Sequence, residues 1–115
     1  MDQNLLYITS VENIPYEGYS FNVDDRKIAL FKIADKIYAI EDRCTHLHVQ
    51  LTMGFREKNI IGCPLHGALF DIATGKVLQG PAVHDLETFR VVVENGEVYF
   101  DRGQITKHKR TKDSD

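Results

Sequence analysis

Two short motifs in the sequence contain residue types that bind metals. The first is Cys-x-His at Cys44–His46, and the second, after 16 intervening residues, is Cys-x-x-His at Cys63–His66. Each motif offers one thiolate and one imidazole. Two thiolates and two imidazoles suit either a tetrahedral zinc ion or an iron–sulfur cluster in which two histidines replace two cysteines on one iron. We therefore interpret four side chains as one ligand set: Cys44, His46, Cys63 and His66.

The order of these ligands favours the cluster over zinc. Zinc fingers usually place both thiolates in one short hairpin and both imidazoles on a helix. Here each motif is mixed, and each is expected on a loop that follows a strand. Two matching loops can hold a two-iron cluster from opposite sides, with the thiolates on the inner iron and the imidazoles on the outer one. A structural zinc site is the alternative, and it predicts a colourless protein without a redox signal.

Composition and charge exclude several other classes of protein. The chain has 43% hydrophobic and 27% charged residues, as globular proteins do, and no apolar run approaches the roughly 20 residues of a membrane helix. Its net charge of -3 gives no support for nucleic-acid binding. The start of the sequence lacks the pattern of a secretory signal, so we expect a cytoplasmic chain whose two cysteines stay reduced or bind metal.

The elements that must position the motifs are short strands. A two-residue turn at Ala34-Asp35 and the pair Asn95-Gly96, which suits a type I′ turn, each predict a β-hairpin. Residues 42–55 are expected to form a loop that carries chemistry, and helix is expected to be scarce. The predicted strands are Asn4–Ser10, Lys27–Ile33, Lys36–Glu41, Asn59–Gly62, Ala68–Asp71, Glu87–Glu94 and Glu97–Phe100.

These strands predict an all-β sandwich or barrel formed by a single domain. At 115 residues the chain is long enough for one hydrophobic core and too short for two ordinary domains. We assign residues 1–105 to the domain. Residues 106–115 are polar and without apolar periodicity, and they are expected to be a disordered tail.

The two motifs, together with Phe70-Asp71 and Thr74–Lys76, resemble the Rieske ferredoxins of bacterial aromatic-ring-hydroxylating oxygenase systems. The similarity runs from about Leu5 to Phe100. It implies a Rieske-like antiparallel β-sandwich or barrel with a cluster-binding subdomain of two loops. It also implies one Rieske-type 2Fe-2S cluster on the four ligands named above.

The resemblance further implies a low-potential electron carrier and not an enzyme. Such a ferredoxin accepts one electron from an NAD(P)H-dependent flavoprotein reductase and passes it to a terminal Rieske non-heme iron oxygenase that dihydroxylates aromatic rings. The ligand imidazoles at the tip would be the electron's entrance and exit. We expect a monomer without nucleic-acid or membrane partners. The alternative is a small Rieske subunit of another oxidoreductase, such as assimilatory nitrite reductase.

Departures from other Rieske branches refine this expectation. The high-potential respiratory proteins carry an additional cysteine in each cluster loop, where this chain has Val49 and Leu65. They also carry hydroxyl groups where this chain has Ala68 and Phe70. Because hydrogen bonds to the cluster sulfurs stabilise the added electron, their loss predicts a potential near the low end of the range, about -150 mV.

Three further residues near the motifs receive an interpretation. Gly80-Pro81-Ala82 resembles the proline-containing loop that covers the cluster in this family, so Pro81 is expected to lie near it. His48 is interpreted as a solvated loop residue, and His84 is given no functional role.

Overall fold

The computed structural model describes residues 4–45, 49–65, 67–81 and 84–105. Their strands form three antiparallel sheets, so the predicted all-β class is confirmed. The first sheet has the order β1-β11-β10, the second β2-β3-β4-β9, and the third β5-β6-β7-β8. Residues 106–115, predicted to be a disordered tail, lie outside the described residues.

The strand bounds are β1 Leu5–Ser10, β2 Tyr19–Val23, β3 Arg26–Ile33, β4 Lys36–Glu41, β5 Phe55–Glu57, β6 Ile60–Gly62, β7 Leu69–Asp71, β8 Val77–Gln79, β9 Thr88–Phe89, β10 Val91–Glu94 and β11 Glu97–Asp101. The helical elements among the described residues are short 3-10 turns at Val11–Asn13, Leu51–Met53 and Arg102–Gln104. No helix in this part of the chain has the length and apolar character needed to cross a membrane.

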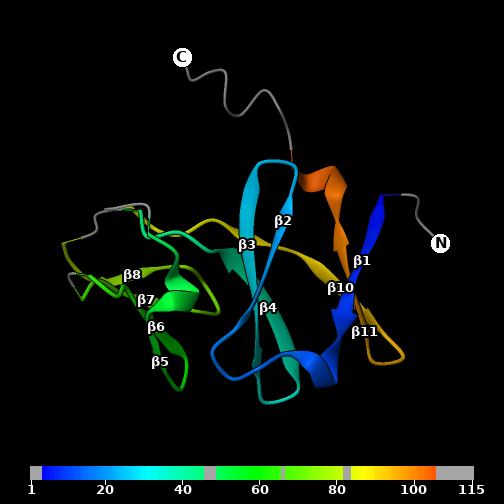
Figure 1. Ribbon diagram of the computed structural model, residues 1–115, viewed down its shortest axis with the longest axis horizontal. Coiled ribbons are helices and arrows are strands. Elements are labelled where there is room, and N and C mark those ends of the chain that lie inside the picture. The colour runs from blue at the N-terminus through cyan, green and yellow to red at the C-terminus, as the bar shows by residue number, and fades with distance from the viewer. Residues whose placement is uncertain (1–3, 46–48, 66, 82–83, 106–115) are drawn as a thin grey trace.

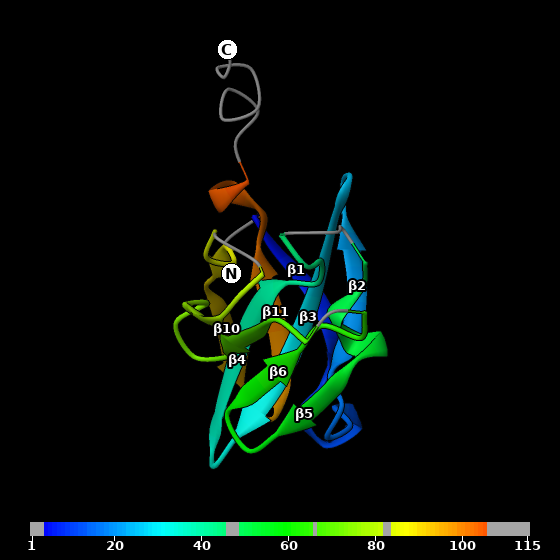
Figure 2. The same cartoon turned by 90° about the vertical axis from the view of Figure 1, so that its left-hand side faces the viewer.

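The three sheets enclose two hydrophobic cores. Figure 1 shows the β5–β8 sheet at one side of the molecule, β1, β10 and β11 at the other, and β2–β4 between them. One core lies between the first two sheets and contains Val98, Phe100 and Leu30. The other contains Phe31 and Ile40 of the second sheet, Phe70 of the third, and both cysteines. In Figure 2, which views the molecule from the side of the third sheet, β5 and β6 lie in front of β3 and β4.

Both predicted hairpins are present. In the β10–β11 hairpin Glu94 lies opposite Glu97, which leaves Asn95 and Gly96 as a two-residue turn. Their φ angles are 56° and 79°, the positive values that a type I′ turn requires. In the β3–β4 hairpin Ile33 lies opposite Lys36, so Ala34 and Asp35 form the turn.

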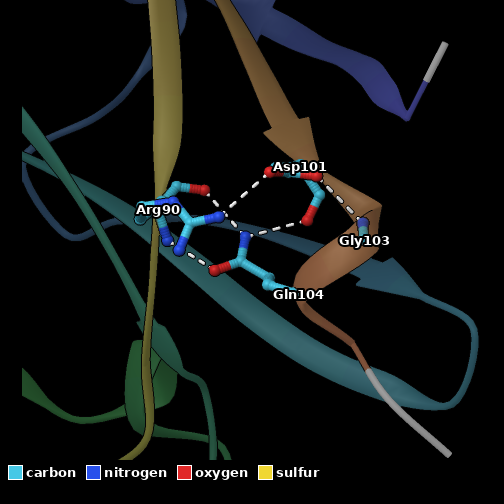
Figure 3. A network of polar contacts seen from close by, with 4 residues as sticks. All are labelled: Arg90, Asp101, Gly103 and Gln104. Carbon is cyan, nitrogen blue, oxygen red and sulfur yellow. Dashed lines mark hydrogen bonds and ion pairs between the residues drawn. The ribbon is translucent and has the colours of Figure 1, made fainter. Parts of the chain in front are cut away.

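The strand predicted over Glu87–Glu94 is wrong, because the structure divides it between two sheets. β9 pairs with β4, whereas β10 pairs with β11. At Arg90, between them, the side chain of Gln104 replaces a strand neighbour: its Oε1 accepts from the backbone N–H of Arg90 at 2.8 Å, and its Nε2 donates to the Arg90 carbonyl at 2.9 Å. The Arg90 side chain also pairs with Asp101 at 3.1 Å (Figure 3). The chain can therefore change sheets without leaving backbone groups unpaired.

Three strands, β2, β5 and β8, were not predicted from the sequence. β2 follows a turn closed by a hydrogen bond from the Gly18 N–H to the Pro15 carbonyl, and the turn residues dominate that stretch of sequence. β5 and β8 have three residues each, too few to show an alternating pattern. Tertiary pairing with β3, β6 and β7 forms these strands, not local propensity.

Arg56 in β5 fastens the third sheet to the second. Its guanidinium donates to the carbonyls of Tyr16 at 2.8 Å and Lys32 at 3.0 Å, which belong to the chain before β2 and to β3. It also lies over the Tyr16 ring, 4.3 Å from the centroid. The Tyr16 hydroxyl in turn accepts from the backbone N–H of Lys58 at 2.9 Å. Arg56 therefore helps to set how the β5–β8 sheet sits on the rest of the fold, together with the core that the two sheets share.

We expect Arg56→Met to lower the free energy of unfolding by about 2–3 kcal/mol, because methionine keeps much of the apolar stem and loses the charged hydrogen bonds. A domain of this size should then melt roughly 10 °C lower. The measurement is thermal unfolding followed by circular dichroism. Arg102→Met is the matched control, since Arg102 is exposed and its side chain pairs with Asp24 at 3.2 Å in a surface ion pair. Equal effects of the two substitutions would contradict the role given to Arg56.

Candidate metal centre

The two predicted cysteine ligands begin two loops and lie in one hydrophobic core. Cys44 follows β4 and is fully buried, and Cys63 follows β6 with 2% of its surface exposed. Both pack within the core that includes Leu51, Ile61 and Phe70. The cysteines are not joined by a disulfide bond. The two predicted histidine ligands, His46 and His66, lie outside the described residues, as does His48.

The two loops are built alike. The backbone N–H of Cys44 donates to the carbonyl of Val49 at 2.7 Å, and that of Cys63 donates to the carbonyl of Ala68 at 2.8 Å. In each loop the cysteine is therefore bonded to the residue five positions further along the chain. Each predicted histidine falls inside the segment that this bond closes. Two equivalent loops, each beginning with a buried thiol, fit the pattern inferred from the sequence.

Two glycines bring the end of the first loop against the start of the second. Phe55, at the start of β5, pairs with Gly62 at the end of β6. A Cβ added to Gly54 would come within 2.0 Å of the Gly62 carbonyl oxygen and 3.1 Å of Cδ of Pro64. A Cβ on Gly62 would strike the Phe55 ring. The loops can approach this closely only because neither position carries a side chain.

A buried carboxylate that the sequence analysis missed joins the start of the first loop to its end. Asp42 is fully buried two residues before Cys44. Its Oδ1 accepts from the backbone N–H of Thr52 at 2.8 Å, and its Oδ2 accepts from the hydroxyls of Thr52 at 2.7 Å and Ser20 at 2.9 Å. The sequence run Glu41–Arg43 resembles a solvated charged segment. The period-2 pattern of β4 was the available signal, because it places Asp42 on the same face as the buried Ile40.

A third segment, which begins at the end of β8, is bonded to both loops. The Thr45 hydroxyl donates to the backbone carbonyl of His84 at 2.8 Å, and Nε2 of Gln79 donates to the carbonyl of Gly67 at 3.2 Å. Pro81 lies in this segment and is exposed. Its expected position near the cluster stays a prediction, because the predicted ligands His46 and His66 lie outside the described residues.

The two positions that lack hydroxyl groups are both buried. Ala68 supplies the carbonyl that closes the second loop, and its side chain is fully buried. Phe70 in β7 is also fully buried and packs in the core that contains both cysteines. The surroundings of the two thiols are therefore mostly apolar.

Comparison with known proteins identifies the family. The model of the Rieske [2Fe-2S] domain matches residues 4–90. The 3-phenylpropionate/cinnamic acid dioxygenase ferredoxin subunit of Escherichia coli (strain K12) is 39% identical over 100 residues, which make up 85% of this chain and 93% of that protein. The ferredoxin component of the naphthalene 1,2-dioxygenase/salicylate 5-hydroxylase systems of a Ralstonia species is 38% identical over 85% of this chain and 95% of its own.

A solved structure of a related ferredoxin has the same fold. A chain in the complex of reduced oxygenase and oxidized ferredoxin in carbazole 1,9a-dioxygenase superposes with a TM-score of 0.81 at 30% identity, over 92% of this chain and 100% of that one. The family match decides between the cluster and the zinc ion that the ligand types alone left open. The chain therefore belongs to the Rieske [2Fe-2S] domain family, as a ferredoxin of the kind found in bacterial aromatic-ring dioxygenase systems, and carries one Rieske-type 2Fe-2S cluster.

Proposed function

We propose that this ferredoxin takes single electrons from an NAD(P)H-dependent flavoprotein reductase and delivers them to a terminal Rieske non-heme iron oxygenase. The pair of like-built loops, each beginning with a buried cysteine, carries this proposal. The bound cluster supplies one-electron redox chemistry, and the chain provides its binding site and the surface for its partners. The relatives named above are ferredoxin components, which supports an electron carrier over a catalytic subunit. We place the protein in the cytoplasm, where its cysteines would stay reduced.

We propose Cys44 and Cys63 as ligands of the inner iron, and His46 and His66 as ligands of the outer iron. Two thiolates and two imidazoles are the donor set of a Rieske centre. Burial of both cysteines supports the inner position for the iron that they hold. The outer iron then lies nearer the surface, which shortens the path of an electron to a partner.

Replacing any one of these four ligands, as in Cys44→Ser or His66→Ala, should abolish the Rieske signal in electron paramagnetic resonance, because the cluster loses a bond to iron. His84→Ala is the matched control. The structure uses the backbone carbonyl of His84, which alanine retains. A variant that kept the native signal after loss of one of the four side chains would remove that residue from the ligand set.

The exposed apolar surface of the second loop supports the terminal oxygenase as a partner. Leu65 is 59% exposed, and its neighbour Pro64 is exposed as well. Both lie between the proposed ligands Cys63 and His66. Exposed apolar side chains at such a position suit a transient interface whose core is small and apolar. The solved complex of a related ferredoxin with its oxygenase gives this partner a precedent.

We expect Leu65→Glu to weaken binding to the oxygenase about tenfold, because one central apolar contact is worth roughly 1–2 kcal/mol in an interface. The measurement is the affinity of the purified ferredoxin for the oxygenase. The visible spectrum should stay unchanged, which shows that the cluster is intact. Val92→Glu is the control, since Val92 is 40% exposed but lies in β10, in the sheet at the other side of the fold. Equal weakening by both variants would reject the proposed surface.

We also propose a midpoint potential near the low end of the Rieske range, about -150 mV. The apolar side chains at Ala68 and Phe70 support it, because a hydroxyl donor at either position could stabilise the added electron.

Ala68→Ser should therefore raise the midpoint potential, provided that the new hydroxyl reaches a cluster sulfur. The measurement is an anaerobic redox titration followed by electron paramagnetic resonance. Ala39→Ser is the matched control: Ala39 is 2% exposed and packs in the other core, away from both loops. A potential that fell in Ala68→Ser, or that rose equally in the control, would refute the hydrogen-bond explanation.

A further inference from the structure

The side chains of Asp42 and three polar neighbours form a closed ring of hydrogen bonds. Nε2 of Gln50 donates to the hydroxyl oxygens of Ser20 at 3.1 Å and Thr52 at 2.9 Å. Both hydroxyls then donate to Oδ2 of Asp42. The bonds run from the Gln50 amide through the hydroxyls to the carboxylate, because each hydroxyl has one proton to donate. We call these residues the Asp42 ring: Ser20, Asp42, Gln50 and Thr52.

The ring compensates for the burial of a charge. Asp42 is fully buried, and an isolated carboxylate in that position would be very costly. Together with the Thr52 N–H, the ring gives the carboxylate three donors. Replacing a buried polar network by well-packed apolar groups is often neutral or stabilising, so stability alone is a weak reason for such a group. A role in fixing geometry is the better explanation.

The two loops differ in what closes them at the base. The second loop connects β6 to β7, and these strands pair directly, with Gly62 opposite Leu69. A ladder of backbone hydrogen bonds therefore holds both ends of that loop. The first loop connects β4 of the second sheet to β5 of the third, and β4 pairs with β3 and β9 while β5 pairs with β6. Strand pairing does not close its base.

The Asp42 ring takes the place of that missing ladder. It joins residue 42 at the start of the first loop to residue 52 at its end, outside the inner bond from Cys44 to Val49. Ser20 in β2 ties the ring to the second sheet, and the backbone N–H of Asp42 donates to the Lys27 carbonyl in β3 at 2.8 Å. Two nested closures thus fix the backbone on both sides of the proposed ligand Cys44.

We propose that Asp42 is a positioning residue for the 2Fe-2S cluster, acting through Thr52 and Ser20 on the loop that carries Cys44. The proposal rests on the proposed ligand set. Release of the ring lets the first loop shift relative to the second, and the cluster then experiences altered ligand geometry. Cluster retention, the g values and the midpoint potential should all respond.

Thr52→Val is the most direct test, because valine keeps the volume of threonine and removes the hydroxyl that donates to Asp42. Loss of the cluster to an iron chelator should become about tenfold faster, as found for changes to groups that orient metal ligands. The g values and the midpoint potential of the folded holoprotein should shift as well. Ser20→Ala should act in the same direction, and Asp42→Ala more strongly.

Two further variants separate positioning from general destabilisation. Ser10→Ala is the matched control, because the Ser10 hydroxyl also donates to a carboxylate, Glu97 at 2.9 Å, but in the sheet away from the loops. In Asp42→Asn, unlike Asp42→Ala, cluster loss should be as slow as in the unsubstituted protein and the g values should be near-native. Its amide can donate to both hydroxyls while the Gln50 amide turns to accept from them, which reverses the ring without opening it.

Folded holoprotein of Thr52→Val and Ser20→Ala with native g values, potential and cluster retention would overturn the positioning role. These two variants test the positioning role even if Asp42→Ala does not assemble a cluster. Absence of a Rieske signal from the unsubstituted protein would instead refute the proposed function. The two failures are therefore distinguishable.

Discussion

The pairing of β5 with β6 is the interaction on which the metal centre depends. It sets the end of the first loop directly against the start of the second, with Phe55 opposite Gly62. The contact is so close that a Cβ on Gly54 would lie 2.0 Å from the Gly62 carbonyl oxygen. Two buried thiols from distant parts of the sequence can serve one cluster only if the loops that carry them keep a fixed separation. The two glycines permit that separation, and the strand ladder maintains it.

The remainder of the fold holds this pair of loops in place. Arg56 joins the third sheet to the second through carbonyl groups of Tyr16 and Lys32. At the opposite side, the Gln104 amide satisfies the backbone of Arg90, so the chain that returns from the third sheet can enter first the second sheet and then the first. In both places a side chain makes a connection between sheets that the backbone ladders do not make. The Asp42 ring is a third instance of the same arrangement.

Much of this architecture was predictable, and the residues that escaped prediction share a cause. The motif spacing, the Asn95-Gly96 turn and the alternating strands are local patterns, and the structure confirms the hairpins and the all-β class. The division of Glu87–Glu94 depends on Gln104, which lies ten or more residues further along the chain. Asp42 depends on Ser20, 22 residues earlier. Neither partner is visible in a local window, and the three-residue strands β5 and β8 form only through their neighbours.

The surroundings of the cysteines bear on the potential in a way that the missing hydroxyls alone do not capture. Both thiols pack among apolar side chains, which stabilise an added negative charge poorly. Asp42, separated from Cys44 only by Arg43, adds a buried carboxylate that three donors hold in place. The apolar core therefore favours a low potential, and the Asp42 ring acts on the same centre through the geometry of the loop that carries Cys44.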